Sequence, residues 1–570
     1  YPPRIEGDSA IYQMPKIVPG TYSISDFGRF VSDFTAVDKK GKEMEVARLD
    51  TNRWAVVPAK DLEYVSYWVD DTFDEPQSGV FAPGGTQIEA GECVIFNAFG
   101  FVGYFRDAKN NPFELHVERP EDFYGATTLP RGESVNGTDV FLAADYFELH
   151  DCPILYARPD TASAMVGDTE ILVAVYSQNG RITADQVMEV IGDLFPATAE
   201  YLGGTLPTDK YGVLVYFSSN PALMAGMGAL EHHTSTVVIM PEWPMEGIAQ
   251  YLIDITAHEF LHIVTPLNIH SEHVADFDFI HPSMSRHLWL FEGVTEYTAH
   301  HVQVTQGLIT VEDFLATIKE KLQTASLYRE DVSFTEMSQG VLGPYEDQFL
   351  NVYMKGALVG MALDLRLLHL SEGAYGLKDL MKDLMERYGT DRPFEDSKLF
   401  DIITEVSGMP EIKAFLENYI AEPNPLPMEE VLGYAGVTYH DVKTDTVVST
   451  GYANIGFNPR SEKMVVVSTN QMDDFGRALG FERKDAIMEW NGAEVTAENF
   501  HEVMQGFRAT VQPGDRVEVK VLRENENGES DTVTLSAEAM PTTVTQENVL
   551  SLDPNPSPMQ LKIRKAWLGN

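Results

Sequence analysis

The chain has 570 residues, with 41 Lys and Arg against 87 Asp and Glu, which gives a formal net charge of −46. A surface this negative repels nucleic acids and anionic membranes, so neither is expected as a partner. The hydrophobic content of 44% indicates packed globular domains rather than disorder, and no apolar run approaches the roughly 18 residues of a membrane-spanning helix.

Residues 1–170 are predicted to form a β-sandwich-like domain. Short runs of alternating apolar and polar residues, such as residues 45–49 and 54–57, are broken by Gly, Pro, Asp and Asn, which is typical of antiparallel strands. The only two cysteines of the chain, Cys93 and Cys152, lie in this region. They are compatible with one disulfide bridge or with two buried free thiols.

From residue 171 the pattern changes to alternating strands and helices. Residues 171–176 and 211–217 are apolar strand-like runs, and Thr183 is placed to cap the helix between them. The apolar residues 236–240 are predicted to form an edge strand that faces a cleft. A mixed sheet followed by a helical lobe is therefore expected over residues 171–425.

The sequence HEFLH at residues 258–262 lies in an apolar run that Pro266 ends. On a helix, His258 and His262 stand one turn apart on the same face, a spacing that lets two imidazoles bind one metal ion. Glu259 lies beside them, where a general base must sit to take a proton from a water molecule activated by the metal.

A catalytic zinc ion keeps three protein ligands, so a third ligand is needed. Thr265 and Asn268 occupy the positions of the glycine and the third histidine of an HxxGxxH continuation, which excludes that arrangement. Glu292 and Glu296 lie four residues apart in LFEGVTEY, so one can bind the metal while the other orients a ligating histidine. Other histidines near the motif lack this helical spacing: His270, His273, His281, His287, His300 and His301.

Residues 349–370 are strongly apolar with helical spacing, and Tyr353 lies near the start of this predicted helix. A tyrosine at this position could belong to the core. Its phenol could instead donate a hydrogen bond to the oxyanion of a tetrahedral intermediate. The spacing alone leaves both interpretations open.

Three prolines between residues 423 and 427 indicate a linker, and residues 426–545 are predicted to form a PDZ-like domain. Its pattern is a strand at residues 464–467, an Asn491-Gly492 turn, a helix at residues 497–507 and a strand at residues 516–522. Asn454 stands where the carboxylate-binding loop of such domains often has glycine, so peptide capture and a docking role are both open. Residues 546–570 are predicted to be a polar C-terminal tail.

Four motifs, which follow one another along the chain in the order of one enzyme family, resemble that family. HEFLH followed by LFEGVTEY resembles the gluzincin metallopeptidases. GALEH at residues 228–232 resembles the GAMEN-type segment of the aminopeptidase N superfamily, and YMKGA at residues 353–357 resembles its YxKGA segment. Together with PGTY at residues 19–22 and the PDZ-like region, the chain looks most like the glycyl aminopeptidase family.

The resemblance implies a multidomain α+β protein whose catalytic domain is thermolysin-like. It also implies one Zn²⁺ per chain, bound by the two histidines and Glu292. Glu231, with Gly228 and Ala229 beside it, would bind the free amino group of the substrate, and Tyr353 would stabilise the transition state. A preference for glycine or alanine as the first residue, and a periplasmic or secreted location, are implied as well.

The predicted function is a zinc aminopeptidase that acts on peptides with a free N-terminus. One alternative is a zinc endopeptidase with a related cleft. Another is a peptide-binding or scaffold protein that uses its PDZ-like domain and keeps an inactive metal site. Whether the chain forms a homo-oligomer, and whether the PDZ-like domain has a ligand, are left open by the sequence.

Overall fold

The computed structural model describes residues 1–3, 5, 7–75, 79–135, 137–525 and 529–569. The chain forms two compact units. The first comprises Tyr1–Tyr439 together with Leu550–Asn570, and the second is His440–Val549. No helix within the described ranges combines the length and the apolar character needed to cross a membrane.

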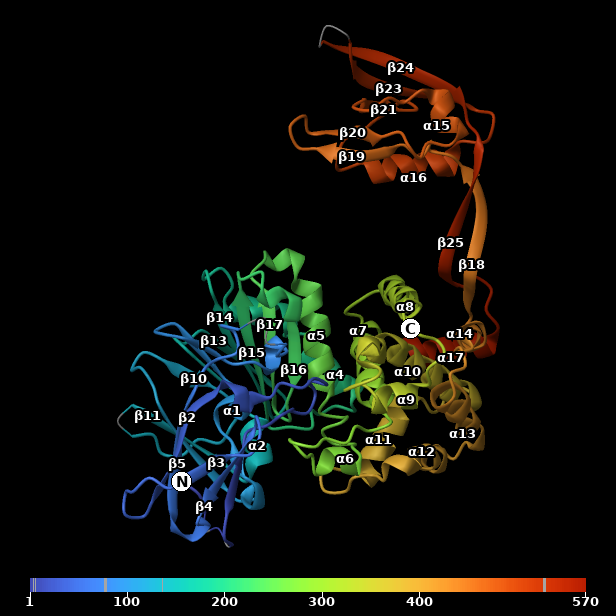
Figure 1. The fold of residues 1–570 in the computed structure, drawn as a ribbon. Helices are drawn as coiled ribbons and strands as arrows, with labels where there is room; N and C mark the ends of the chain where they lie inside the picture. The colour runs from blue at the N-terminus through green and yellow to red at the C-terminus, as the bar shows by residue number, and fades with distance from the viewer. Residues whose placement is uncertain (4, 6, 76–78, 136, 526–528, 570) are drawn as a thin grey trace. The chain divides into compact units, whose positions relative to one another are not determined.

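The N-terminal region is rich in β-structure, as the alternating sequence pattern predicts (Figure 1). Its strands form two four-stranded sheets, ordered β3-β4-β1-β8 and β10-β12-β7-β6, and the two-stranded pairs β2-β5 and β9-β11. The bounds are β1 (Ala10–Gln13), β2 (Val31–Asp38), β3 (Glu45–Arg48), β4 (Arg53–Val57), β5 (Leu62–Val69), β6 (Gln87–Glu89), β7 (Cys93–Phe96), β8 (Tyr104–Phe105), β9 (Phe113–Glu118), β10 (Tyr124–Ala126), β11 (Thr138–Ala143) and β12 (Ile154–Ala157), with helices α1 (Ala98–Phe101) and α2 (Tyr146–His150) between them.

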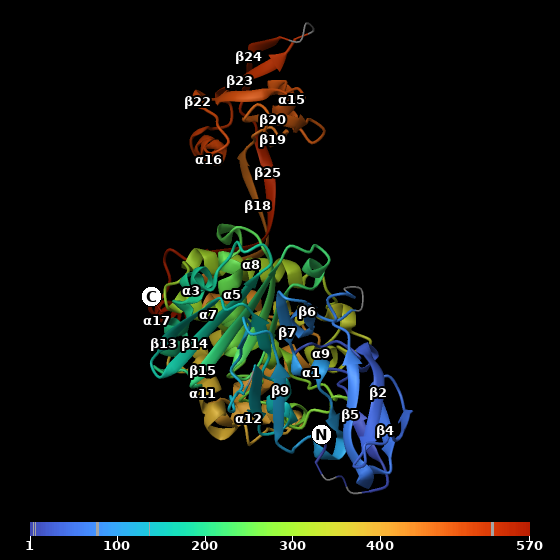
Figure 2. The same ribbon diagram turned by 90° about the vertical axis from the view of Figure 1, so that its left-hand side faces the viewer.

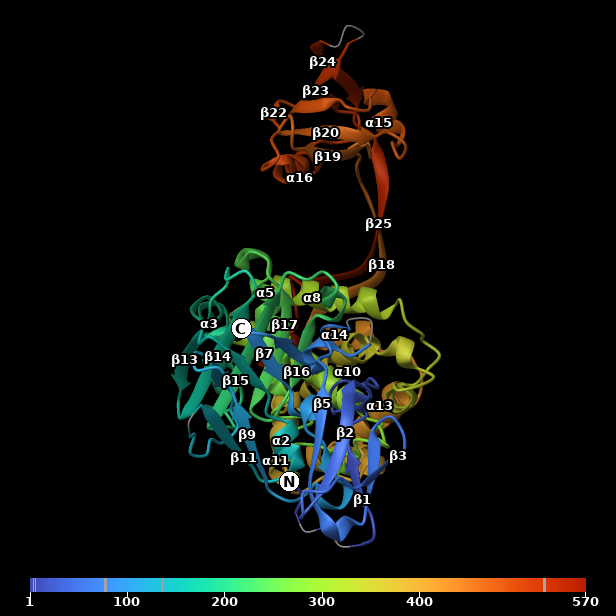
Figure 3. The same ribbon diagram turned by 60° about the vertical axis from the view of Figure 1, so that its left-hand side comes forward.

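A five-stranded sheet with the order β13-β14-β15-β17-β16 follows; Figure 2 labels β13, β14 and β15, and Figure 3 labels all five strands. Its strands are β13 (Thr161–Val166), β14 (Thr169–Ser177), β15 (Lys210–Ser218), β16 (Gly228–Glu231) and β17 (Ser235–Pro241), with helices α3 (Ala184–Ile191) and α4 (Leu194–Tyr201) between β14 and β15. The strands β14, β15 and β17 are parallel, whereas β13 and β16 run antiparallel at the two edges.

The prediction that residues 236–240 form an edge strand is wrong. These residues belong to β17, which is hydrogen-bonded to β15 on one side and to β16 on the other. Every residue of β17 is buried, and a continuous apolar run is typical of an interior parallel strand covered on both faces. The edge that borders the site is β16, which carries Gly228, Ala229 and Glu231.

Alternate residues of the five-stranded sheet pack against different layers. Val173 packs in one apolar cluster with Val187 of α3 and Phe260 of the next helix, α5 (Ala249–Leu261). Ala174 belongs to a separate cluster that contains Ile95 of the small sheet β10-β12-β7-β6. The central sheet is therefore enclosed between helices and the second N-terminal sheet.

The helical lobe is built around a long buried helix, α10 (Asn351–Leu370) (Figure 1). The other elements of the lobe are α6 (Glu272–Ala275), the π-helical turn η8 (Trp289–Val294), α7 (Thr295–Thr305), α8 (Val311–Ala325), α9 (Phe334–Gln339), α11 (Leu377–Arg387), α12 (Leu399–Ser407), α13 (Pro410–Leu416) and α14 (Met428–Tyr434). Gly293 and Gly356 let α10 and η8 touch, because a Cβ atom on Gly293 would lie 2.4 Å from the backbone of Gly356. The glycine of the YMKGA motif is thus a packing residue beneath the segment that carries Glu292.

The C-terminal residues return to the first unit as helix α17 (Pro558–Leu568). Trp567 of this helix is fully buried, and its indole Nε1 donates a hydrogen bond of 2.8 Å to the hydroxyl of Tyr297 on α7. The region predicted as a polar tail is therefore partly a core helix. A capping box formed by Ser557 and Gln560, with Pro558 at the first position, starts it.

The second unit contains a sheet with the strand order β19-β20-β21-β23-β24, in which β22 also pairs with β21 (Figure 3). The paired strands β18 (Val437–Val448) and β25 (Pro541–Leu552) extend beyond the bounds of this unit. Its other elements are β19 (Asn454–Asn458), β20 (Lys463–Ser468), α15 (Asp474–Leu479), β21 (Ala486–Trp490), β22 (Ala493–Glu494), α16 (Phe500–Thr510), β23 (Arg516–Glu524) and β24 (Ser530–Glu538). Asn491 and Gly492 both have positive φ in the turn from β21 to β22, as a tight hairpin requires.

Candidate metal centre

Helix α5 carries both histidines of the HEFLH motif. His258 lies in its last turn and His262 is its C-terminal cap residue, and the centroids of their rings are 4.7 Å apart. Nδ1 of His258 donates to Glu296 Oε2 at 2.7 Å, and Nδ1 of His262 donates to the carbonyl oxygen of Thr265 at 3.0 Å. Because both rings use Nδ1 in this way, both turn Nε2 toward the same point.

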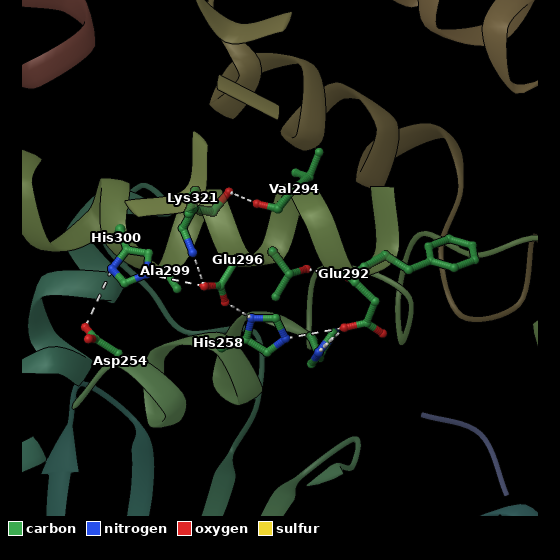
Figure 4. Close-up of polar contacts among 12 residues, drawn as sticks. Asp254, His258, Glu292, Val294, Glu296, Ala299, His300 and Lys321 are labelled. Atoms are coloured by element: carbon green, nitrogen blue, oxygen red, sulfur yellow. Dashed lines mark hydrogen bonds and ion pairs between the residues drawn. The ribbon is translucent and has the colours of Figure 1, made fainter. Parts of the chain in front are cut away.

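Glu292 lies at that point. Its Oε2 is 3.4 Å from Nε2 of His258 and 3.5 Å from Nε2 of His262 (Figure 4). The ligand atoms of these three residues all lie within 4.8 Å of one another, and all three side chains are buried. Two imidazoles and one carboxylate that converge in this way are a donor set that fits zinc.

The protonation states of His262 and Glu292 agree with this interpretation, whereas His258 would have to release a proton to a metal ion. Burial lowers the pKa of His262 to about 4, so its imidazole is neutral near pH 7. Burial alone would raise the pKa of Glu292, but the neighbouring His262 and His258 lower it below its ordinary value. Burial lowers the pKa of His258, and its hydrogen bonds to Glu292 and Glu296 more than reverse this effect. A carboxylate and a neutral imidazole are forms that bind metal ions.

Glu296 is fixed by several cationic or polar neighbours. Its Oε1 lies 2.5 Å from Nζ of the buried Lys321 and 3.4 Å from Nε2 of His300, whose Nδ1 is 3.6 Å from Asp254 (Figure 4). Burial would raise the pKa of Glu296, yet Lys321 and His258 hold it well below its ordinary value. Glu296 is therefore a charged acceptor that orients the His258 ring.

The sequence patterns did not predict that Lys321 and His300 are partners of the Glu296 carboxylate. A signal was present for Lys321, since it lies seven residues after Phe314 and three after Ile318, on the apolar face of α8. A lysine on a buried helix face needs a partner for its charge.

Glu259 is buried beside the centre, and its Oε2 has no hydrogen-bond partner among the described residues. Burial raises its pKa to about 8, with His258 acting against this rise and Glu292 adding to it. A buried carboxylate with a pKa near neutrality has the properties of a general base.

Glu231 ends the edge strand β16 and brings a carboxylate oxygen within 4.8 Å of the ligand atoms of Glu259 and His262. Burial, followed by the charges of Glu292 and Glu259, raises the pKa of Glu231 well above its ordinary value. Gly20 lies against this carboxylate, because a Cβ atom at position 20 would be 2.4 Å from Glu231 Oε1. The crowded carboxylates make this a place where a cation from outside would be stabilised.

Tyr353, near the start of α10, places its ring 5.6 Å from the ring of His258. Burial and the charges of Glu292 and Glu231 raise the pKa of its phenol well above 10. The phenol therefore stays protonated near pH 7 and can act as a hydrogen-bond donor.

Tyr22 completes the centre and was not predicted as a site residue. It comes from the N-terminal region, and its hydroxyl donates a hydrogen bond of 2.5 Å to Oε1 of Glu292. Its ring contacts Phe349, which in turn contacts Tyr353, with centroids 5.6 and 5.5 Å apart. Tyr22 has a φ of 44°, a strained value for a residue other than glycine, and such strain clusters at functional sites.

Cys93 and Cys152 are both free and buried. Of the two possibilities that the sequence left open, two unpaired thiols are therefore present. Burial raises the pKa of Cys152 to about 12, so this thiol is unreactive near pH 7.

Comparisons with known proteins identify two matching family models. The N-terminal domain of peptidase M61 matches residues 2–158, and M61 glycyl aminopeptidase matches residues 251–359. No curated protein sequence matches the chain.

Among solved structures, an aminopeptidase N family protein from Idiomarina loihiensis is 20% identical, with a TM-score of 0.70 over 99% of this chain and 96% of that chain. An M1 zinc metallopeptidase from Deinococcus radiodurans is 15% identical, with a TM-score of 0.46 over 74% of this chain and 88% of that one. The first comparison shows that a known protein shares the fold of this chain.

Proposed function

We propose that this chain, which matches M61 family models over residues 2–158 and 251–359, is a zinc-dependent aminopeptidase that removes single residues from the free N-termini of peptides. The observation that carries this proposal is the convergence of His258, His262 and Glu292, with the unpartnered Glu259 beside them. Zinc bound by these three residues would supply Lewis acidity, which polarises a carbonyl oxygen and makes water more acidic.

Glu259 is proposed to move the protons of the reaction. With a pKa raised to about 8, it can accept a proton from the attacking water and later donate it to the leaving amine. Tyr353 would donate a hydrogen bond to the carbonyl oxygen as negative charge develops there. Near pH 7 the phenol of Tyr353 is protonated and can donate. Glu259, with a pKa of about 8, is mostly protonated there and would become the proton acceptor once a bound metal cation lowers that pKa.

Glu231 is proposed to bind the ammonium group of the first residue, with Gly228 and Ala229 of the same edge strand along the substrate backbone. An ammonium ion would neutralise a carboxylate that burial and two neighbouring carboxylates destabilise. Since Glu231 lies so close to Glu259 and His262, the bound amine and the scissile carbonyl belong to the same residue. This arrangement makes cleavage depend on a free N-terminus.

The test compares hydrolysis of aminoacyl anilides with free and with acetylated amino groups, in the wild type and in Glu231→Gln. We expect acetylation to reduce kcat/KM by at least about 100-fold in the wild type and much less in the variant, because the charge pairing is already absent there. Equal cleavage of free and acetylated substrates by the wild type would favour the zinc endopeptidase instead. Hydrolysis that continues unchanged in a Glu259→Gln variant would not come from this centre, which would mean an inactive metal site and favour the binding or scaffold alternative.

The unit His440–Val549 is proposed to be a PDZ-like module in a periplasmic or secreted protein. The support is the order of its elements and the position of β19 at an edge of the sheet, where a peptide strand can add. Fluorescence polarisation with peptides ending in a free carboxylate or an amide tests peptide capture. If peptides with a free carboxylate and with an amide bind equally, or if neither binds, the module does not capture peptide C-termini, and a docking role remains for it.

A further inference from the structure

A cavity of about 500 Å³ borders Glu231. Tyr22 and Gly20 also line it, but His258, His262 and Glu292 do not. The cavity therefore begins at the carboxylate proposed to hold the substrate amine and extends away from the metal ligands.

The walls of the cavity are mostly aromatic and aliphatic. Phe99 and Phe147 contribute from the N-terminal region, and Phe277, Leu288 and Phe291 contribute from the helical lobe. Leu288 and Phe291, which lie four residues and one residue before Glu292 in the chain, are each 1% exposed. These side chains are held by the packed core, so the cavity is a preformed apolar site.

A polar corner is formed by Asp151 and His233. Asp151 is paired with His233, whose backbone nitrogen donates to Asp151 Oδ2 at 2.9 Å. Asp151 already has its histidine partners, and Glu148, the other carboxylate of the lining, accepts a hydrogen bond from the backbone nitrogen of Ala144. Glu231 is therefore the carboxylate of the lining that a substrate ammonium would neutralise.

The short distance from Glu231 to the metal ligands limits where a substrate side chain can go. Carboxylate oxygens of Glu231 and Glu259 and a ligand atom of His262 lie within 4.8 Å of one another. An extended residue spans about 3.3–3.6 Å, so the backbone of one residue fills this interval. The side chain of that residue can then lie in the apolar cavity that borders Glu231.

We propose that this cavity binds the side chain of the first substrate residue and selects large apolar or aromatic side chains, such as leucine, methionine and phenylalanine. The inference rests on the proposed function and concerns its substrate class. Glycine or alanine, the preference implied by the family resemblance, would leave most of a 500 Å³ apolar space unused. A large side chain would remove this apolar surface from water, which stabilises the bound state.

The experiment is a panel of glycyl, alanyl, leucyl and phenylalanyl anilides assayed with the zinc-loaded protein. We expect kcat/KM for the leucyl or phenylalanyl anilide to exceed that for the glycyl anilide by at least about 100-fold, since each methylene in an apolar pocket contributes about 10-fold or more. The highest kcat/KM on glycine or alanine would overturn the inference and leave the aminopeptidase intact. No hydrolysis of any free-amine anilide would instead refute the proposed function.

A variant of Val274 tests whether the cavity causes the preference. Val274 lines the cavity from α6, and Val274→Trp should lower the ratio of phenylalanyl to glycyl kcat/KM by at least about 10-fold, because the indole occupies the space. Val442→Trp, at a position 57% exposed on the second unit, is the matched control and should keep the ratio. An unchanged ratio in folded Val274→Trp would contradict the inference. If Val274→Trp does not fold, Val274→Ala replaces it, and this larger cavity should raise the ratio.

The position at which a peptide is cut shows which substrate residue occupies the cavity. If the cavity instead holds the side chain of the second substrate residue, a peptide that begins Gly-Phe would be cut after Phe in one step. Mass spectrometry of early time points distinguishes the two cases. We expect glycine to be released first from Gly-Phe peptides, and direct cleavage after Phe would contradict the assignment.

Discussion

The hydroxyl of Tyr22 donates a hydrogen bond of 2.5 Å to Oε1 of Glu292, while Oε2 of the same carboxylate faces the two histidines. The N-terminal β region therefore reaches a proposed metal ligand 270 residues away in the chain. This contact holds one oxygen of Glu292 and leaves the other for a metal ion. It makes the geometry of the centre depend on docking between the N-terminal region and the helical lobe.

Replacing Tyr22 with Phe should therefore weaken metal binding. The substitution keeps the ring but removes the hydrogen bond, and loss of such an outer contact costs about 10–100-fold in metal affinity. Competition with a chromophoric chelator measures the zinc Kd.

A control for Tyr22→Phe is Tyr12→Phe, which removes another buried hydroxyl of the N-terminal region, 2.7 Å from that of Tyr67. Both variants should lose some thermal stability, but the control should keep the zinc Kd. If Tyr22→Phe also keeps the wild-type Kd, the hydrogen bond to Glu292 has no role in the metal centre.

Glu259→Gln should abolish most turnover and retain the metal. Glutamine is close in shape but cannot accept the proton, and general acid–base catalysis contributes about 10²–10⁴-fold to rate. We expect kcat to fall by that factor while zinc content per chain stays at the wild-type value. The exposed Glu320→Gln is the matched control. Loss of zinc in Glu259→Gln would show that Glu259 is itself a ligand.

Tyr353→Phe should lower kcat by about 10²–10³-fold, the usual effect of removing one donor to a developing oxyanion. KM and zinc content should change little, because the phenol is proposed to act mainly in the transition state. Tyr375→Phe, which removes a hydroxyl hydrogen-bonded to Asp383 at 2.8 Å, serves as the control. Wild-type kcat in Tyr353→Phe would favour the simpler interpretation of Tyr353 as a core residue.

Trp567→Ala should destabilise the first unit, although residue 567 lies almost at the end of the chain. The indole is fully buried and donates to Tyr297, which in turn donates to Asp364 at 2.6 Å. Removal of a buried tryptophan side chain costs about 3–5 kcal/mol of unfolding free energy. Denaturant unfolding measures this loss, and Trp68→Ala, at a position 73% exposed, should be nearly neutral. Equal stability of the two variants would mean that α17 does not belong to the core.

The parts of the site that lie on one helix could be predicted from sequence. The spacing of His258 and His262 and the four-residue interval between Glu292 and Glu296 each follow from helical periodicity. The structure brings His258, His262 and Glu292 together and places Glu296 against His258. Local periodicity contains the spacing within each pair, because the two residues of a pair are close in the chain. The approach of Glu292 to His258, 34 residues away, is inferred instead from the need of a catalytic zinc ion for a third ligand.

Contacts between distant segments could not be predicted in the same way. Tyr22 reaches Glu292 through a loop with a strained φ, and neither its conformation nor its partner is encoded in a periodic pattern. The edge position of β16 was missed because strand order depends on long-range pairing, whereas the apolar run of β17 is visible locally. Helix α17 was missed although its capping box was readable, since its burial depends on α7 far upstream.

The central claim is that His258, His262 and Glu292 hold one zinc ion. X-ray diffraction from crystals of the zinc-loaded protein, recorded on both sides of the zinc absorption edge, locates the ion directly. The account predicts one anomalous peak per chain between Nε2 of His258, Nε2 of His262 and Oε2 of Glu292, and the loss of that peak in Glu292→Gln. A fully occupied peak elsewhere with none at this position, or a peak that survives Glu292→Gln unchanged, would contradict it.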